Sequence, residues 1–70
     1  MNKPTAETVK DLSLRAITEL SRIVKMTKDQ CSSREEFENL ARAVGRIIGL
    51  IETDILAIAY RDFPELDDLS

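Results

Sequence analysis

Residues 37–60 read FENLARAVGRIIGLIETDILAIAY, and this stretch decides the fold. Its apolar side chains recur at alternating steps of four and three residues, which is the heptad pattern of a helix that packs along one face. We call these positions the heptad seam. Its members are Phe37, Ala41, Val44, Ile48, Ile51, Ile55 and Ile58. The spacing predicts one long helix with a single packing face.

Local signals predict where this helix begins and ends. Ser33 and Glu36 match the capping box, in which the hydroxyl and the carboxylate each accept a hydrogen bond from a backbone N–H. Pro64 disfavours a helical conformation in the residue before it, so the helix should stop near Asp62. The second helix is therefore expected over about residues 33–62.

A first helix is predicted upstream, over about residues 5–28, with Thr5 as its N-cap. Residues 29–33 would join the two helices, and a loop this short makes them antiparallel. The prediction rests on apolar residues that are again spaced by threes and fours. They are Val9, Leu12, Ala16, Ile17, Leu20, Ile23 and Val24.

The expected fold is all-α, an antiparallel helical hairpin in a single domain of residues 1–70, with an acidic tail over residues 63–70. Residues 55–60 are all apolar or aromatic and point all round the helix, so one neighbouring helix cannot cover them. A chain of 70 residues with one cysteine has no internal disulfide, and such small domains usually need a partner. We therefore expect a homodimer in which two hairpins form a four-helix bundle.

Small residues recur every four positions along the predicted second helix, and we call them the small-residue row. Its members are Ala41, Gly45, Gly49, Thr53 and Ala57. A glycine inside a helix costs about 1 kcal/mol relative to alanine, so two of them need a reason. We interpret the row as close packing inside the hairpin or the dimer. The alternative is a groove for a foreign ligand. The residues assigned to helix and dimer packing are Ala41, Gly45, Gly49, Thr53, Ala57, Ile55, Leu56, Ile58 and Tyr60.

The sequence does not indicate catalytic chemistry. It contains no histidine, its nearby carboxylates diverge around the helix, and both glycines lie inside an apolar helical pattern rather than in a phosphate-binding loop. Cys31 lies in a polar loop, where we expect an exposed and incidental thiol. We predict a non-enzymatic protein with no catalytic, metal or cofactor site.

Hydropathy predicts a cytoplasmic protein that makes no membrane contact. The longest apolar stretch, residues 47–60, has 14 residues and contains Glu52 and Asp54, whereas a membrane span takes about 20 apolar residues. No apolar signal segment follows Met1, and the lone Cys31 suits a reducing compartment.

Charge is distributed unevenly along the chain. Residues 1–28 carry six basic and three acidic side chains, and residues 29–70 carry four and ten. The net charge of −3 argues against general affinity for nucleic acid. We expect a small adaptor or regulator that binds an unidentified protein. The alternative is an RNA-binding dimeric bundle, because the architecture is similar at fold level to Rop-type RNA-binding hairpins and Arg15, Arg22 and Lys25 line the outer face of the first helix.

The tail is a second candidate for partner binding. Phe63, Leu66 and Leu69 are spaced by three with acidic residues between them, which is typical of a short helix that anchors in a groove of another protein. In the alternative interpretation, Phe63 folds back and covers the end of the bundle near Tyr60. Truncation after Asp62 separates the two hypotheses.

Overall fold

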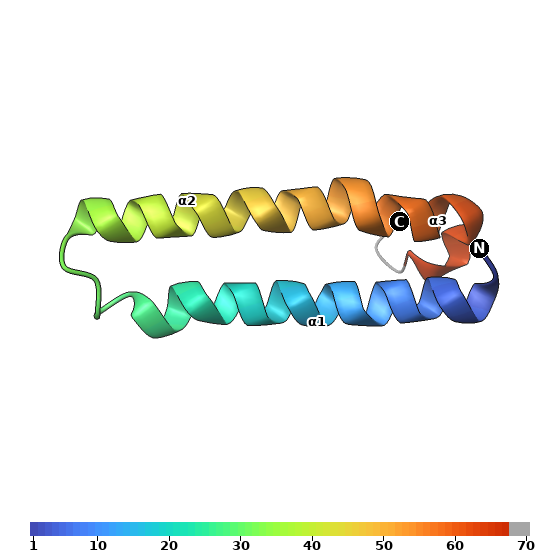
Figure 1. The fold of residues 1–70 in the computed structure, drawn as a ribbon, viewed down its shortest axis with the longest axis horizontal. Coiled ribbons are helices and arrows are strands. Elements are labelled where there is room, and N and C mark those ends of the chain that lie inside the picture. The colour runs from blue at the N-terminus through green and yellow to red at the C-terminus, as the bar shows by residue number, and fades with distance from the viewer. Residues whose placement is uncertain (68–70) are drawn as a thin grey trace.

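The computed structural model describes residues 1–67 and is a helical hairpin with dimensions of 46 × 18 × 16 Å (Figure 1). The predicted all-α, two-helix arrangement is confirmed. The second helix is not uniform, because a π-helical turn interrupts it. The elements are α1 (Lys3–Thr27), α2 (Arg34–Leu50), the π-helix η1 (Ile51–Leu56), α3 (Ala57–Asp62) and the 3-10 turn η2 (Pro64–Leu66).

Helix α1 begins at Lys3, and its N-cap is Asn2 rather than Thr5. The Asn2 side-chain oxygen accepts a hydrogen bond from the backbone N–H of Thr5 at 2.9 Å. Pro4 lies in the first turn, where its missing N–H would have no intrahelical partner. The prediction of Thr5 as the cap was wrong, because asparagine is a stronger cap than threonine and Asn2 occupies the position before the first helical residue.

The start of α2 contains the capping box. Ser33 Oγ accepts a hydrogen bond from the N–H of Glu36 at 3.1 Å. The returning bond runs from the N–H of Ser32 to Glu36 Oε1 at 3.3 Å, one residue earlier than in the ideal motif. Two backbone donors at the helix start therefore have side-chain acceptors.

The second helix leaves the heptad seam at η1. A π-helical turn holds one residue more than an α-helical turn, so every later residue moves to a different side of the helix. Beyond η1 the buried positions are Leu56 and Ala59, which are 4% and 0% exposed. Ile55 and Ile58 are instead 47% and 45% exposed. Ile55 and Ile58, the last two members of the heptad seam, therefore do not pack inside the hairpin, and their contact with a second chain stays a prediction.

The hairpin buries little apolar surface. Among the described residues, four hydrophobic side chains are buried and no large side chain is completely buried. These four residues are Ala6, Val44, Leu56 and Ala59. Below about 70–80 residues a single core rarely supplies more than about 3–5 kcal/mol of stability. With two alanines among its four buried positions, this core lies at the weak end of that range.

The two ends of the described chain meet at one end of the hairpin, where the chain turns back between α1 and α3 (Figure 1). The Met1 ammonium lies 3.1 Å from a carboxylate oxygen of Asp62. Lys3 Nζ lies 3.6 Å from a carboxylate oxygen of Glu65. The first ion pair joins the chain start to the last residue of α3, and the second joins the first residue of α1 to η2. The loop between α1 and α2 lies at the other end.

Candidate interaction surface

Seven large apolar side chains project from one side of the hairpin, and we call this surface the apolar face. Each of them is between 40% and 63% exposed. The members are Leu12, Ile23 and Met26 of α1, and Ile47, Leu50, Ile55 and Ile58 of the second helix.

Helical geometry places these residues on a common side. At about 100° per residue, the three members on α1 fall on one flank of that helix. On the second helix, Ile47 and Leu50 share a flank, and the additional residue of η1 returns the next two members to it. Because the helices are antiparallel, the two flanks adjoin and form one surface that runs along the hairpin.

The opposite side of the hairpin is covered in part by the chain itself. Leu14 of α1, which is 42% exposed, points to this side rather than to the apolar face. It lines a cavity of about 300 Å³. The other lining residues are Ile17, Glu52, Leu56, Tyr60 and Asp67. The segment after α3 therefore lies against the side that carries Leu14.

The tail residues proposed for partner binding lie against this hairpin where the structure describes them. Phe63 and Leu66 are half-buried, and the backbone N–H of Leu66 donates to the carbonyl of Phe63 at 3.0 Å within η2. Tyr60 is half-buried as well. Leu69 lies outside the described residues. The contacts of Phe63 and Leu66 agree with a tail that folds back on its own domain.

The two glycines of the small-residue row make no close side-chain contact inside the hairpin. A Cβ atom built on Gly45 or Gly49 meets no other atom within 4 Å. Ala41 and Ala57 are half-buried, and Thr53 is exposed with its hydroxyl donating to the carbonyl of Gly49 at 3.0 Å. The two glycines therefore do not provide the close helix contact expected of them inside the hairpin, because helical geometry turns both away from the apolar face and toward open space. Contact between the row and a second chain stays a prediction.

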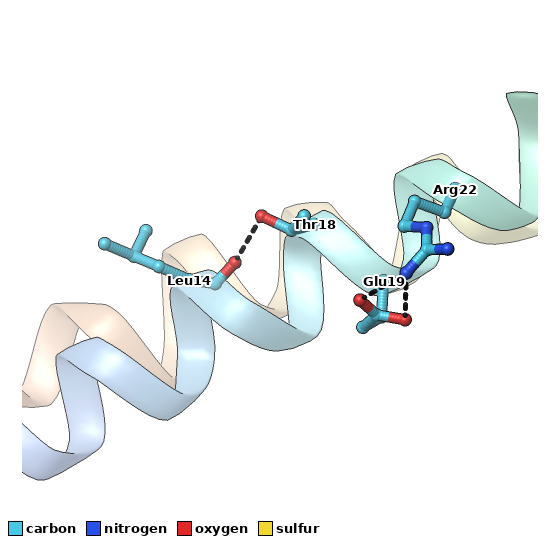
Figure 2. A network of polar contacts seen from close by, with 4 residues as sticks. All are labelled: Leu14, Thr18, Glu19 and Arg22. Atoms are coloured by element: carbon cyan, nitrogen blue, oxygen red, sulfur yellow. Dashed lines mark hydrogen bonds and ion pairs between the residues drawn. The ribbon is translucent and has the colours of Figure 1, made fainter.

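The basic residues proposed for RNA binding lie on α1, where the carboxylate of Glu19 lowers the positive electrostatic potential around them. Arg22 Nη1 lies 3.1 Å from Glu19 Oε1 and 3.4 Å from Oε2 (Figure 2). Thr18 donates its hydroxyl to the backbone carbonyl one turn earlier, at 3.0 Å. Arg15 and Lys25 are exposed. The structure therefore brings the three cations to one helix, but Arg22 is already paired.

Three further features of the described part of the chain concern metal-ligand clusters, membrane-spanning helices and the lone thiol. Residues 1–67 contain no cluster of three His, Cys, Asp or Glu side chains that could hold a metal ion. Within the same residues, no helix has both the length and the apolar character that crossing a membrane requires. Cys31 is a free thiol, half-buried rather than exposed as expected, in a loop cavity that Phe37 also lines.

The α1 half of the apolar face was not predicted from the sequence. Leu12 and Ile23 were assigned to the stripe that packs against the second helix, and Met26 was not assigned at all. The signal that could have found them is the width of the stripe. Apolar residues on α1 span about half of its circumference, which is wider than a single neighbouring helix covers.

Comparisons with protein-family models, with curated proteins and with solved structures found no match for this chain. The interpretation of the apolar face therefore rests on its own geometry and chemistry.

Proposed function

We propose that this protein is a small, non-enzymatic adaptor or regulator of the cytoplasm that acts through protein–protein interaction, with the apolar face as its contact surface. The observation that carries the proposal is the collection of seven large exposed side chains on one side of a hairpin that buries four hydrophobic residues in its described part. Contiguous exposed apolar patches of this kind mark interaction sites.

The first occupant of the apolar face is a second copy of the chain. Two hairpins that join by this face form an antiparallel four-helix bundle, in which exposed side chains such as Leu50, 52% exposed, become core residues. Complete burial of a large apolar side chain contributes roughly 1.5–3 kcal/mol, and about half of that remains to be gained at each of these seven positions, which are 40–63% exposed. The small core of one hairpin and its exposed apolar face therefore both support a dimeric four-helix bundle.

RNA binding receives less support from the described residues. Arg22 is paired with Glu19, and α1 carries no aromatic side chain on which a base could stack. Protein contact through the apolar face needs neither a basic surface nor a stacking residue.

Sedimentation equilibrium of the wild-type chain at micromolar concentration tests the proposal. We expect a dimer whose dissociation constant changes little between 50 mM and 500 mM salt, because an apolar interface depends weakly on ionic strength. A folded monomer would contradict it. Titration with a fluorescent single-stranded RNA is the second arm, and tight binding that weakens steeply with salt would favour the RNA-binding alternative.

A further inference from the structure

We infer that the two copies pack with their two-fold axis parallel to the helices, so that α1 of one copy lies on the second helix of the other. This inference rests on the proposed dimer. Two identical hairpins can place their apolar faces together in two symmetric ways. An axis parallel to the helices pairs α1 with the partner's second helix, whereas an axis perpendicular to them pairs α1 with α1 and the second helix with itself.

The charges of the two helices favour the parallel axis. Helix α1 carries five basic and three acidic side chains, a net charge of +2. Residues 34–62 carry four basic and six acidic side chains, a net charge of −2. The parallel axis brings helices of opposite charge together at both contacts. The perpendicular axis brings like charge onto like charge at both, and such electrostatic mismatch suppresses an assembly.

The sizes of the side chains on the apolar face favour the same arrangement. The pairs Met1–Asp62 and Lys3–Glu65 fix which residues of the two antiparallel helices lie at the same position along the hairpin axis, which we call the same level. Ala16 of α1 lies level with the region of Leu50, and Ile23 lies level with Ala43 on the second helix. Each helix therefore has small residues at the level where the other has large ones.

The parallel axis preserves these levels across the dimer, so small side chains meet large ones. Ala16 then faces Ile47 and Leu50 of the other copy, and Ala43 faces the partner copies of Ile23 and Met26. The perpendicular axis instead reverses the levels about the middle of the hairpin, so that Leu50 meets Leu50 and Ala16 meets Ala16. The first pair would overpack and the second would leave a void, and both defects destabilise a core.

Charged residues at the edge of the apolar face also favour the two-fold axis parallel to the helices. Glu19 lies level with Arg46, and both are exposed on flanks that the parallel axis brings together. The perpendicular axis would instead place Arg15, which lies near the middle of α1, against Arg15 of the second copy. The first arrangement joins opposite charges, and the second joins like charges.

Disulfide trapping between single-cysteine chains tests the arrangement. All variants carry Cys31→Ser. A chain with Leu12→Cys is mixed with a longer, tagged chain with Ile55→Cys, and the mixture is unfolded, refolded and oxidised. Leu12 and Ile55 face each other across the parallel-axis interface, and disulfides require Cβ atoms about 3.5–4.5 Å apart. We expect the mixed disulfide to exceed either self-linked product several-fold. Replacing Leu12→Cys by Thr18→Cys, on the outer side of α1, should reduce the mixed product to background.

A chain that carries Leu50→Cys, with Cys31→Ser, detects the perpendicular axis. Only that axis brings two copies of residue 50 together, so only that axis lets this chain form a disulfide with itself. Efficient self-linking of this chain, or absence of the mixed Leu12–Ile55 product, would overturn the inference. Sedimentation equilibrium of the Cys31→Ser chain before oxidation separates this failure from that of the proposed function. A monomer would contradict the dimer itself, whereas a dimer with the Leu50 linking pattern would contradict its arrangement alone.

Discussion

The two sides of the hairpin differ in what covers their apolar residues. On one side, Leu14 and Tyr60 share a cavity with Asp67, because the chain turns back over them after α3. On the other side, the members of the apolar face are 40–63% exposed along the length of the hairpin. The segment after α3 therefore leaves Tyr60 half-buried on its side of the hairpin, although Leu14 stays 42% exposed there. The difference means that the tail shields part of one side of the hairpin and leaves the apolar face on the other side for a partner.

Leu50→Asp should have the largest effect, because it acts at the centre of the apolar face. A carboxylate placed there has no partner in the dimer interface, and burying an unpaired charge is costly. We expect the dissociation constant of the dimer to rise at least about 100-fold, equivalent to about 2.7 kcal/mol. Sedimentation equilibrium measures this change. Thr18→Asp, on the outer side of α1, is the matched control and should leave the dimer intact. Equal behaviour of the two variants would show that the face is not an interface.

Truncation after Asp62 acts on the covered side. It removes Phe63 and Leu66, which are half-buried, so we expect a loss of about 1 kcal/mol, or about 4–8 °C in melting temperature for a domain of this size. Thermal unfolding followed by circular dichroism measures it, with truncation after Asp67 as the control. An unchanged melting temperature would instead support the tail as a recognition segment for another protein.

Gly49→Ala should raise stability by about 0.5–1 kcal/mol. The new methyl group meets no other atom within 4 Å, so the higher helix propensity of alanine has no opposing clash. Gly45→Ala lies in equally open space and should behave in the same way. Chemical denaturation gives the free energy of unfolding for each variant. A loss of stability at either position would show that a helix of a second chain packs on this flank instead of on the apolar face.

Deletion of Thr53 should have the smallest effect. The deletion removes the additional residue of η1, so the helix closes into regular turns while Leu56 and Ala59 keep their buried positions. We expect the free energy of unfolding to change by less than about 1 kcal/mol, since no core side chain is lost. Deletion of Arg46 in the regular α2 is the control, because it rotates all later residues by about 100° and should cost several kcal/mol. Similar losses in both deletions would contradict the π-helical turn.

The features that the sequence predicts well are local ones. The capping box at Ser33 and Glu36 and the apolar spacing of both helices depend on residues within a few turns of one another. The N-cap was misplaced because Asn2 and Thr5 are both good caps, and the side chain of Asn2 accepts the hydrogen bond from the N–H of Thr5. Local patterns therefore identify helices more securely than they locate helix ends.

The register of the second helix could not be predicted in this way. In the sequence, the heptad seam continues without interruption through Ile55 and Ile58, and no residue type marks the wider turn. Packing of Leu56 and Ala59 against α1 decides the register, and this contact lies far apart along the chain. The excess of apolar residues at 55–60 was apparent from sequence, but the surface that they join became visible only when α1 was placed beside them.

The π-helical turn also has a consequence for motion. At its start, the N–H of Ile51 is shared between the carbonyls of Ile47 and Ile48, and the hydroxyl of Thr53 donates to the carbonyl of Gly49. A π-helical turn is a place where a helix can kink. Helix α3 lies beyond this turn and ends at the Met1–Asp62 pair, whereas α2 precedes it. We therefore expect amide hydrogen exchange to divide the second helix at η1 into two segments that open separately, rather than to protect it as one rod.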